Sequence, residues 1–567
     1  MQKVLLMLTF SALLGASVAG EKHFIAHGWD LCKVTTSDMV RNLPELEKLP
    51  VDGISITVSR KLPNGKVLFM RNVLSDVRWE KREYKKEVEN IKKISSGRLK
   101  HNFLLTFFSP RRRLAWTDDA AWERATHNVS TFAWIAKTGG MKGVMLDPED
   151  YVRTKQYKLQ PGDPAYPEAA ALARKRGAQI MKAMGTEFPD IVVLAFEFLG
   201  NHINLNSENP KRDVEKDGDL FVPFVNGMLD ELPPNAIMVD ALENGYTCKA
   251  ASHDFYKLAW ELFQVGAKVI EPENLTKFHR QYKMGFGLYL DMYVNSQNKF
   301  FYHAPTNGSR VATLLGNFTE ALACADQYCW VYGERYSWIK WDCATELSKR
   351  PMAVSPETWE DKLPGFLDSM KLIINEKKTL QNIYDKMAGT GKLANLVSNP
   401  KCIPNKAVKT TEGQPDWNTS LLPPGWAFWR AKPNEGKVCL DTSVRMGDSF
   451  SARVLGANNA SFVHKLSMKV KPGQFYACEA FKKGGEQSYL RVRWMANNRW
   501  VINSGSVNIP FSAQKNKQGW QRAFGFVKVP PEVNELLLLV YTGLKPNETA
   551  WYSNPGVFLI YPSEEKQ

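Results

Sequence analysis

Residues 143–151 read GVMLDPEDY, a short apolar run followed by the acidic residues Asp147 and Glu149. Alternation along an extended strand places Met145, Asp147 and Glu149 on one face. Both carboxylates therefore leave the carboxyl end of the predicted strand in the same direction. Several other segments of the chain repeat this pattern of an apolar run that ends in acidic or aromatic residues.

Eight short β-rich apolar runs alternate with helix-like stretches over the first two thirds of the chain. The runs are 23–27, 52–58, 102–108, 143–146, 191–199, 236–242, 284–293 and 328–334. Eight strands that alternate with helices predict a parallel sheet closed into a (β/α)8 TIM barrel. An open doubly wound sheet is the alternative, but it requires a Gly-rich phosphate turn after an early strand, and none is present. We therefore predict an α/β barrel over residues 20–400.

The character of the sequence changes after residue 400. Residues 401–424 hold Pro404, Pro415, Pro423 and Pro424 among polar residues, a composition that predicts an extended linker. From residue 425 to 567, short alternating runs are separated by turn residues. This second pattern predicts an all-β jelly-roll sandwich.

The first 19 residues have the pattern of a signal peptide. Lys3 precedes an apolar run over residues 4–14, and Ser17-Val18-Ala19 fits a small-residue cleavage site. The run is shorter than the roughly 20 residues that span a bilayer, and no later run is long enough. We expect a secreted, periplasmic or cell-surface protein without stable membrane insertion, with an uncleaved N-terminal anchor as the alternative.

Charge and cysteine content narrow the classes of partner. The net charge is +15, but lysines and arginines are dispersed apart from runs such as residues 111–113. Without a long basic tract or zinc-finger spacing, nucleic acid is not an expected partner, and the charge leans toward an acidic or sulfated glycan. Eight cysteines are too sparse for a disulfide scaffold, and Cys324 and Cys329 have no second pair at metal-ligand spacing. No metal or cofactor is expected.

Acidic residues end several consecutive predicted strands. The candidates for catalysis are Asp147, Glu149, Asp240, Glu243, Asp291 and Glu334, and Glu197 ends the fifth strand as a candidate for substrate binding. A single acid at such a place is often a helix cap. Several like charges in one barrel mouth repel each other, which raises some of their pKa values, as acid–base chemistry requires.

Aromatic residues accompany these acids. The candidates for substrate binding in the barrel are Trp29, Tyr151, Tyr246, Tyr293 and Trp338. Sugar rings present apolar C–H faces that stack on aromatic rings, while carboxylates bind hydroxyl groups. Two carboxylates that flank a glycosidic bond are also the usual machinery of glycosidases. The pattern thus favours a glycan as substrate.

The strand ends resemble a family of barrel glycosidases of environmental and gut bacteria. The resemblance covers about residues 22–345 and lies in the segments 27–30, 51–54, 143–149, 240–246, 285–287, 290–291 and 330–334. It implies a barrel fold and a glycosidase activity, but no particular sugar. Strand four is also similar to the end of the chitinase-type D-G-x-D-x-D-x-E signature, with Lys142 and Met145 in place of the first two aspartates. The clan of retaining glycosidases has Glu after strands four and seven, whereas Glu334 follows strand eight here.

The C-terminal segment resembles the jelly-roll carbohydrate-binding modules attached to secreted glycosidases. The similar residues are 520–522, Phe526, 529–530, 536–541 and 548–552, with Ser553-Asn554 in place of the usual Asp pair. The resemblance implies a second glycan-binding surface. Tyr489, Trp494 and Trp500 are its candidate sugar-stacking residues.

The sequence therefore predicts an exported glycoside hydrolase with paired carboxylates. Glu149 is the expected general acid, and Glu334 is the expected nucleophile or base, with Asp240 or Glu243 next. Asp147 is expected to orient Glu149 or to tune its pKa. Two other classes stay open, namely a non-catalytic glycan-binding protein on a barrel scaffold and a metal-dependent barrel hydrolase.

Overall fold

The structure, a computed structural model, describes residues 21–561 apart from 62–63, 65–66, 153, 307, 349–353, 405–421, 433–434, 466 and 503. Two compact units make up the chain, and they divide at Ile373. The predicted fold class, an α/β barrel followed by an all-β sandwich, is confirmed. The signal peptide predicted at 1–19 and most of the linker predicted at 401–424 lie outside the described residues, and the predicted domain limits stay predictions.

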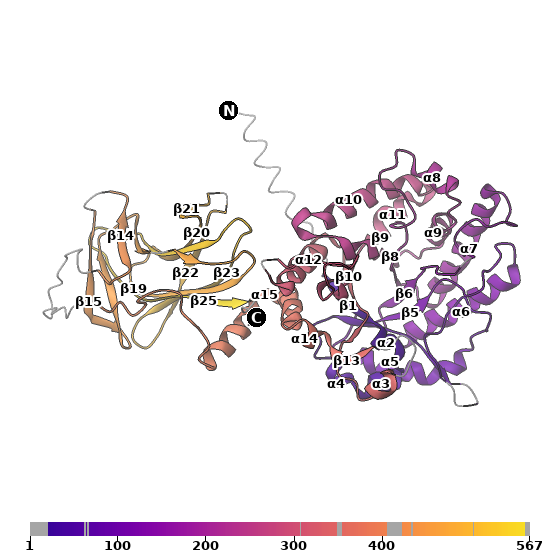
Figure 1. The fold of residues 1–567 in the computed structure, drawn as a ribbon, viewed down its shortest axis with the longest axis horizontal. Helices are drawn as coiled ribbons and strands as arrows, with labels where there is room; N and C mark the ends of the chain where they lie inside the picture. The colour runs from indigo at the N-terminus through magenta and orange to yellow at the C-terminus, as the bar shows by residue number, and fades with distance from the viewer. Residues whose placement is uncertain are drawn as a thin grey trace. The chain divides into compact units, whose positions relative to one another are not determined.

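The first unit is a nearly closed barrel of parallel strands with helices around it (Figure 1). Its strands are β1 (His23–Gly28), β2 (Gly53–Ile56), β5 (Phe103–Phe107), β6 (Gly143–Asp147), β7 (Val192–Ala195), β8 (Ile237–Asp240), β9 (Tyr282–Met284), β10 (Phe286–Tyr289) and β11 (Tyr328–Gly333). Almost all of their residues are buried, because helices cover the outer face and side chains fill the interior. The strands therefore read as apolar runs in the sequence.

The seventh predicted strand is divided at Gly285 into two pieces. β9 pairs with β8, whereas β10 pairs with β11. The Gly285 and Gly287 amides still donate to the carbonyls of Asp240 (2.8 Å) and Leu242 (3.0 Å), so hydrogen bonding continues across the division. A Cβ atom at residue 285 would lie 2.6 Å from the Tyr328 carbonyl oxygen, so only glycine allows this approach. The barrel thus has eight strand positions, and Glu334 follows the eighth.

The helices lie on the outside of the barrel and in the loops that follow its strands (Figure 1). They are α2 (Trp29–Lys33), α3 (Thr36–Arg41), α4 (Leu43–Leu46), α5 (Lys85–Ser96), α6 (Asp119–Thr138), α7 (Tyr166–Glu187), α8 (Pro210–Lys216), α9 (Phe221–Asp230), α10 (Asp254–Gly266), α11 (Leu275–Gln281), α12 (Arg310–Cys324), α13 (Ala344–Ser348), α14 (Trp359–Lys362) and α15 (Phe366–Gly389). The helical backbone of α15 is interrupted at Asn375, beside the division between the units. Two small sheets add to this unit, β3 (Arg60–Lys61) with β4 (Val67–Leu68) and β12 (Tyr336–Ser337) with β13 (Ser355–Thr358). In the described part of the chain, no helix combines the length and apolarity needed to cross a membrane.

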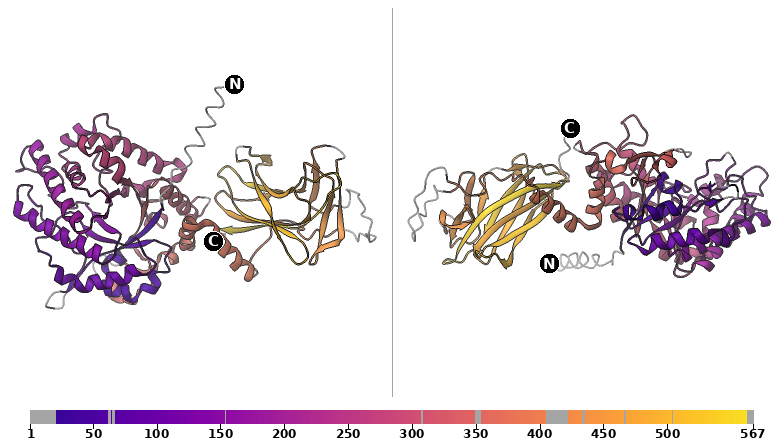
Figure 2. Two further views of the ribbon diagram at one scale, coloured as in Figure 1. Left: turned by 180° about the vertical axis from the view of Figure 1, so that it is seen from behind. Right: turned by 90° about the horizontal axis from the view of Figure 1, so that it is seen from below.

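The second unit is an antiparallel β-sandwich (Figure 2). Its strands are β14 (Trp426–Arg430), β15 (Lys437–Met446), β16 (Ser449–Leu455), β17 (Ala460–His464), β18 (Met468–Lys469), β19 (Phe475–Gly484), β20 (Ser488–Ala496), β21 (Arg499–Trp500), β22 (Ser506–Lys515), β23 (Gln521–Lys528), β24 (Glu535–Thr542) and β25 (Thr549–Tyr561). β22 pairs first with β20 and then with β23, so this strand passes from one sheet to the other. Val397 and Cys402 belong to its apolar core.

Candidate active site

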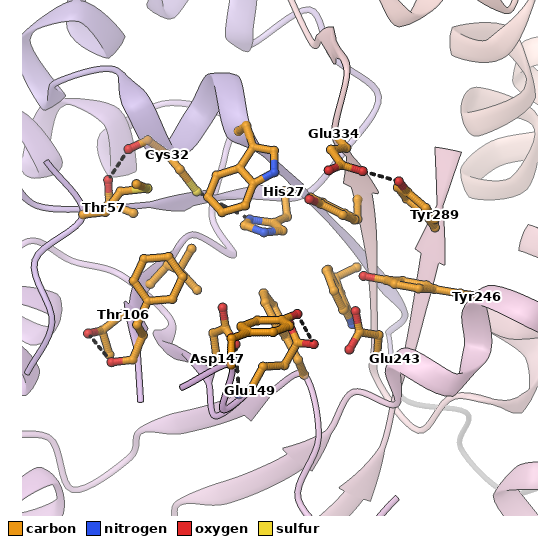
Figure 3. A pocket seen from close by; sticks show the side chains of 18 of the residues that line it. His27, Cys32, Thr57, Thr106, Asp147, Glu149, Glu243, Tyr246, Tyr289 and Glu334 are labelled. Atoms are coloured by element: carbon orange, nitrogen blue, oxygen red, sulfur yellow. Dashed lines mark hydrogen bonds between the residues drawn. The ribbon is translucent and has the colours of Figure 1, made fainter. Parts of the chain in front are cut away.

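One cavity of about 740 Å³ lies at the carboxyl ends of the barrel strands (Figure 3). Each strand position contributes a side chain, namely His27, Thr57, Phe107, Asp147, Phe196, Glu243, Tyr289 and Glu334 in chain order. The volume is within the range of about 300–1,000 Å³ that is usual for small-molecule sites. The cavity is therefore the candidate active site.

The loop after β6 places alternate residues in two different cavities. Asp147, Glu149 and Tyr151 line the candidate active site. Pro148 and Asp150 instead line a second cavity of about 470 Å³. The Glu149 amide donates to the Asp147 carboxylate (3.1 Å), and the Tyr151 hydroxyl donates to the Glu149 carboxylate. The alternation predicted for this strand thus continues for four residues beyond its end, to Tyr151.

Three carboxyl groups of this cavity have raised pKa values. Burial and the charge of Glu149 raise the pKa of Asp147 well above its ordinary value. Burial raises the pKa of Glu149, and the charge of Glu197 acts in the same direction. Burial, followed by the charges of Glu149 and Glu197, raises the pKa of Glu243 to about 8. The cavity therefore holds at least one proton near neutral pH, as a general acid requires.

The raised pKa of Glu243 predicts a stability that depends on pH. Between about pH 4.5 and 8, the unfolded chain has lost this proton and the folded chain retains it, so the free energy of unfolding falls as pH rises. Glu243→Gln should therefore raise the free energy of unfolding at pH 7 by about 2 kcal/mol, a value reduced for partial exposure to solvent in the cavity. Calorimetric melting of the variant and the parent from pH 4 to 8 measures the difference. The two should melt together at pH 4, and a pH-independent difference would contradict the assignment.

Glu334 enters the cavity from the opposite side to Glu149 (Figure 3). It directly follows β11, and its carboxylate accepts a hydrogen bond from the Tyr289 hydroxyl. Its amide donates to the Asp291 carboxylate (2.9 Å), which also pairs with Arg335. Asp291 is fully buried and does not line the cavity. The structure thus places Asp291, a catalytic candidate from the sequence, outside the cavity, where it fixes the backbone that carries Glu334.

Asp240 is likewise away from the cavity. Its fully buried carboxylate accepts the amides of Phe198 (3.0 Å), Leu199 (2.9 Å) and Gly200 (3.2 Å) and the Tyr282 hydroxyl (2.6 Å). Because its lone pairs face these donors, the carboxylate holds the loop after β7 in place. The structure thus places Asp240, another catalytic candidate from the sequence, outside the cavity.

The loop after β7 carries a buried chain of charged groups. His202 lies between Asp219, whose carboxylate is 2.8 Å from Nδ1, and Glu197, whose carboxylate is 3.6 Å from Nε2. Burial acts to lower the pKa of His202, but the carboxylates of Asp219 and Glu197 outweigh it and raise this pKa to about 10. Glu197 lines the second cavity, while Asn201, which donates to Glu197, lines both. Glu197 therefore lies outside the cavity in which substrate binding was expected.

Trp29, Tyr151 and Tyr246 line the cavity as expected from the sequence. The Trp29 indole Nε1 and the Asn244 Oδ1 are buried and have no hydrogen-bond partner among the described residues. Buried polar atoms of this kind without a partner are rare.

Tyr293 and Trp338, which the sequence suggested for substrate binding, are buried outside the cavity. The Tyr293 hydroxyl accepts from Asn317 Nδ2 (3.0 Å). The Trp338 indole donates to the His27 carbonyl (2.9 Å) and thereby supports the end of β1. Both side chains act in packing and leave no face open to a sugar.

Several lining residues were not among the sequence candidates. The most informative are His27, Tyr289 and Tyr332, whose rings lie in contact, with centroids 5.2 Å apart for His27–Tyr332 and 5.1 Å for Tyr289–Tyr332. Burial lowers the pKa of His27 to about 3, so this imidazole is neutral. Tyr289 is the last residue of β10. If the end of this strand had been known from the sequence, alternation along the strand would have placed the Tyr289 side chain in the cavity.

In the sandwich, the structure separates the predicted stacking residues. Trp494 is 2% exposed and lies in the core, whereas Trp500 is 49% exposed. Alternation along β20 explains the difference, because Trp494 shares its face with Leu490 and Val492. Trp494 therefore does not bind a ligand at the surface.

Across the described ranges of the chain, there is no group of at least three His, Cys, Asp or Glu side chains that could hold a metal ion.

No family model matches the chain, and no curated protein matches it.

Solved structures resemble parts of the chain only. The active domain of tailspike protein 4 of bacteriophage CBA120 matches 29% of this chain and 21% of its own, with 18% identity and a TM-score of 0.21. The CBM22-1–GH10 modules of Clostridium thermocellum endo-1,4-β-D-xylanase 10B match 24% of this chain and 26% of their own, with 10% identity and a TM-score of 0.19. The CBM22-1 xylan-binding domain of Paenibacillus barcinonensis Xyn10C matches 24% of this chain and 88% of its own, with 14% identity and a TM-score of 0.19. Similarities this low carry no argument about the activity of this chain.

Proposed function

We propose that this protein is an exported glycoside hydrolase that cleaves a glycosidic bond in an extracellular poly- or oligosaccharide. The observation that carries the proposal is the meeting of Glu149, Glu243 and Glu334 in one aromatic-lined cavity, where burial favours the protonated form of the first two. Carboxylic acid and carboxylate groups on opposite sides of a substrate are what glycosidic cleavage requires.

The lining of the cavity suits a sugar. Trp29, Tyr246 and Tyr332 line the cavity and offer ring faces to C–H groups. Tyr151, which is 81% exposed, extends this aromatic surface beyond the cavity. A polymeric substrate has sugar rings on either side of the cleaved bond, and Tyr151 is placed to stack on one of them.

In the proposed reaction, Glu149 donates its proton to the oxygen of the leaving sugar as the bond to the anomeric carbon breaks. Glu334 acts from the other side, either as the nucleophile or as the base that deprotonates water. The Tyr151 hydroxyl orients Glu149, and the Tyr289 hydroxyl orients Glu334. The charge of Glu149 raises the pKa values of Asp147 and Glu243, so the protons of these three neighbouring carboxyl groups are coupled.

A screen of the purified protein against a panel of polysaccharides tests the proposal. We expect shorter oligosaccharides to be released from at least one polymer, with Glu123→Gln, a change at an exposed residue of α6, releasing them at the parental rate. Binding without any release would instead identify a non-catalytic glycan-binding protein. Loss of release on addition of a chelator would identify a metal-dependent hydrolase.

A further inference from the structure

One face of the sandwich carries charged and aromatic side chains on its outer side. Along β20, Leu490, Val492 and Trp494 point into the core, so Tyr489, Arg491 and Arg493 point outward. β24 and β22 flank β20, and β17 and β14 continue the same sheet beyond β24. This outer surface of β14, β17, β24, β20 and β22 is called the basic face below.

Aromatic rings cross the basic face in one row. Register places Trp429 opposite Ser461, Ser461 opposite Tyr541, and Tyr541 opposite Tyr489. The Tyr489 and Tyr541 rings are stacked, with centroids 4.5 Å apart and planes 13° apart. Trp429 is 54% exposed, whereas Ser461, between it and the tyrosines in the register, is buried. The row offers ring faces to a chain that lies across the strands.

Two arginines lie beside this row. The Arg491 guanidinium is 5.0 Å from the centre of the Tyr489 ring and donates to Asn508 Oδ1 (2.8 Å). The Arg493 guanidinium is 4.4 Å from the centre of the Trp500 ring, which register with Met495 places on the same face. The aromatic contacts hold both guanidinium groups in place.

Neither arginine has a counter-charge within the described part of the chain. Among the described residues, no carboxylate forms an ion pair with Arg491 or Arg493, and the buried Arg493 Nε has no hydrogen-bond partner. Burial and the neighbouring Arg491 lower the pKa of Arg493. Two unpaired like charges on one face cost stability, and an anionic ligand would remove that cost.

The charge of the C-terminal segment acts in the same direction. Residues 425–567 contain 19 Lys and Arg against 10 Asp and Glu, a net charge of +9 out of +15 for the whole chain. A basic segment attracts an anionic polymer before contact is made. The two unpaired arginines then supply a specific place for it to bind.

We propose that the basic face binds a uronate-containing polysaccharide. Arg491 and Arg493 take carboxylate groups of the sugar chain, while Tyr489, Tyr541, Trp429 and Trp500 stack on its rings. A guanidinium is planar and matches a carboxylate with two parallel hydrogen bonds, so a uronate fits better than a neutral sugar. The inference goes beyond the proposed hydrolysis and does not depend on it, because binding at this face requires no turnover.

Binding of the full chain to polygalacturonate, compared with the same polymer after methyl esterification, tests the proposal. Esterification removes the charges and keeps the backbone, so we expect binding to weaken at least about tenfold and the remaining affinity to lose its dependence on salt. Equal binding of the two polymers would overturn the proposal. A thymidine oligonucleotide that binds more tightly than polygalacturonate would also overturn it, because aromatic rings and arginines bind single-stranded nucleic acid as well.

Matched variants locate the site. Arg493→Gln should weaken binding of polygalacturonate about tenfold or more, and Arg493→Lys should recover only part of that loss because lysine lacks the planar fork. Lys437→Gln removes one charge from the exposed Lys437 in the other sheet and should change binding less than about twofold. An equal loss in the Lys437 and Arg493 variants would overturn the specific site. We expect Arg493→Gln to retain hydrolysis and Glu149→Gln to retain binding of polygalacturonate. These two measurements distinguish a failure of this inference from a failure of the proposed function.

Discussion

Glu149→Gln should reduce kcat on an unactivated polysaccharide by about 10²–10⁴-fold and leave KM almost unchanged. Glutamine is nearly isosteric with glutamate and still accepts the hydrogen bond from the Tyr151 hydroxyl, but it has no acidic proton to give to the leaving sugar. An aryl glycoside with an acidic phenol as leaving group needs no such proton. Its rate should therefore fall much less, and the comparison of the two substrates is the decisive measurement.

Tyr151→Phe is the matched control for this variant. It removes the hydroxyl that orients Glu149 and keeps the carboxyl group, so we expect a loss of kcat of less than about tenfold. An unchanged rate in Glu149→Gln on the polysaccharide would remove Glu149 from the mechanism. Glu243, the other cavity acid with a raised pKa, would then be the next candidate for the acid.

Glu334→Ala should reduce kcat by about 10³-fold or more on both kinds of substrate. The side chain acts on the anomeric carbon or on the attacking water, a step that a better leaving group does not replace. The two glutamates are thus separated by leaving-group dependence, since only the Glu149 variant is rescued by an activated substrate. Kinetics with both substrates, at the pH optimum of the parent protein, measure this difference.

Added azide gives a second measurement on Glu334→Ala. The shortened side chain leaves space in the cavity, and azide can attack the anomeric carbon of an activated substrate to form a glycosyl azide.

Tyr289→Phe is the matched control for Glu334→Ala. It removes only the hydroxyl bound to Glu334, so kcat should fall less than about tenfold. A Glu334→Ala variant that cleaves the polysaccharide at the parental rate would contradict the assignment.

The glutamates of the cavity and the arginines of the basic face differ in their electrostatic surroundings. The cavity removes carboxyl groups from water, which raises the pKa values of Asp147, Glu149 and Glu243. The basic face keeps its arginines charged on the surface of a sheet, where aromatic rings hold them. Variants in one should therefore leave the measurement on the other unchanged.

The sequence by itself determined the fold class and the end of the barrel at which the acids lie. Strands buried on both faces must be apolar, and helices must separate parallel strands, so the eight runs and their spacing are visible without a structure. Alternation along GVMLDPEDY also placed Asp147 and Glu149 together, because neighbouring residues of a strand fix each other's direction. These features depend on local geometry alone.

Only the tertiary structure decided which acids line the cavity. Asp240 ends β8 and Asp291 follows β10, as Glu149 follows β6. Yet Asp240 binds three amides of the loop after β7, and Asp291 binds Arg335 and the Glu334 amide. Likewise, Trp494 is in the core and Trp500 at the surface, a difference set by the register of β20 and β21. The residues that bind a carboxylate or bury an aromatic ring come from segments far along the chain. The spacing of residues within one strand carries no information about these distant segments.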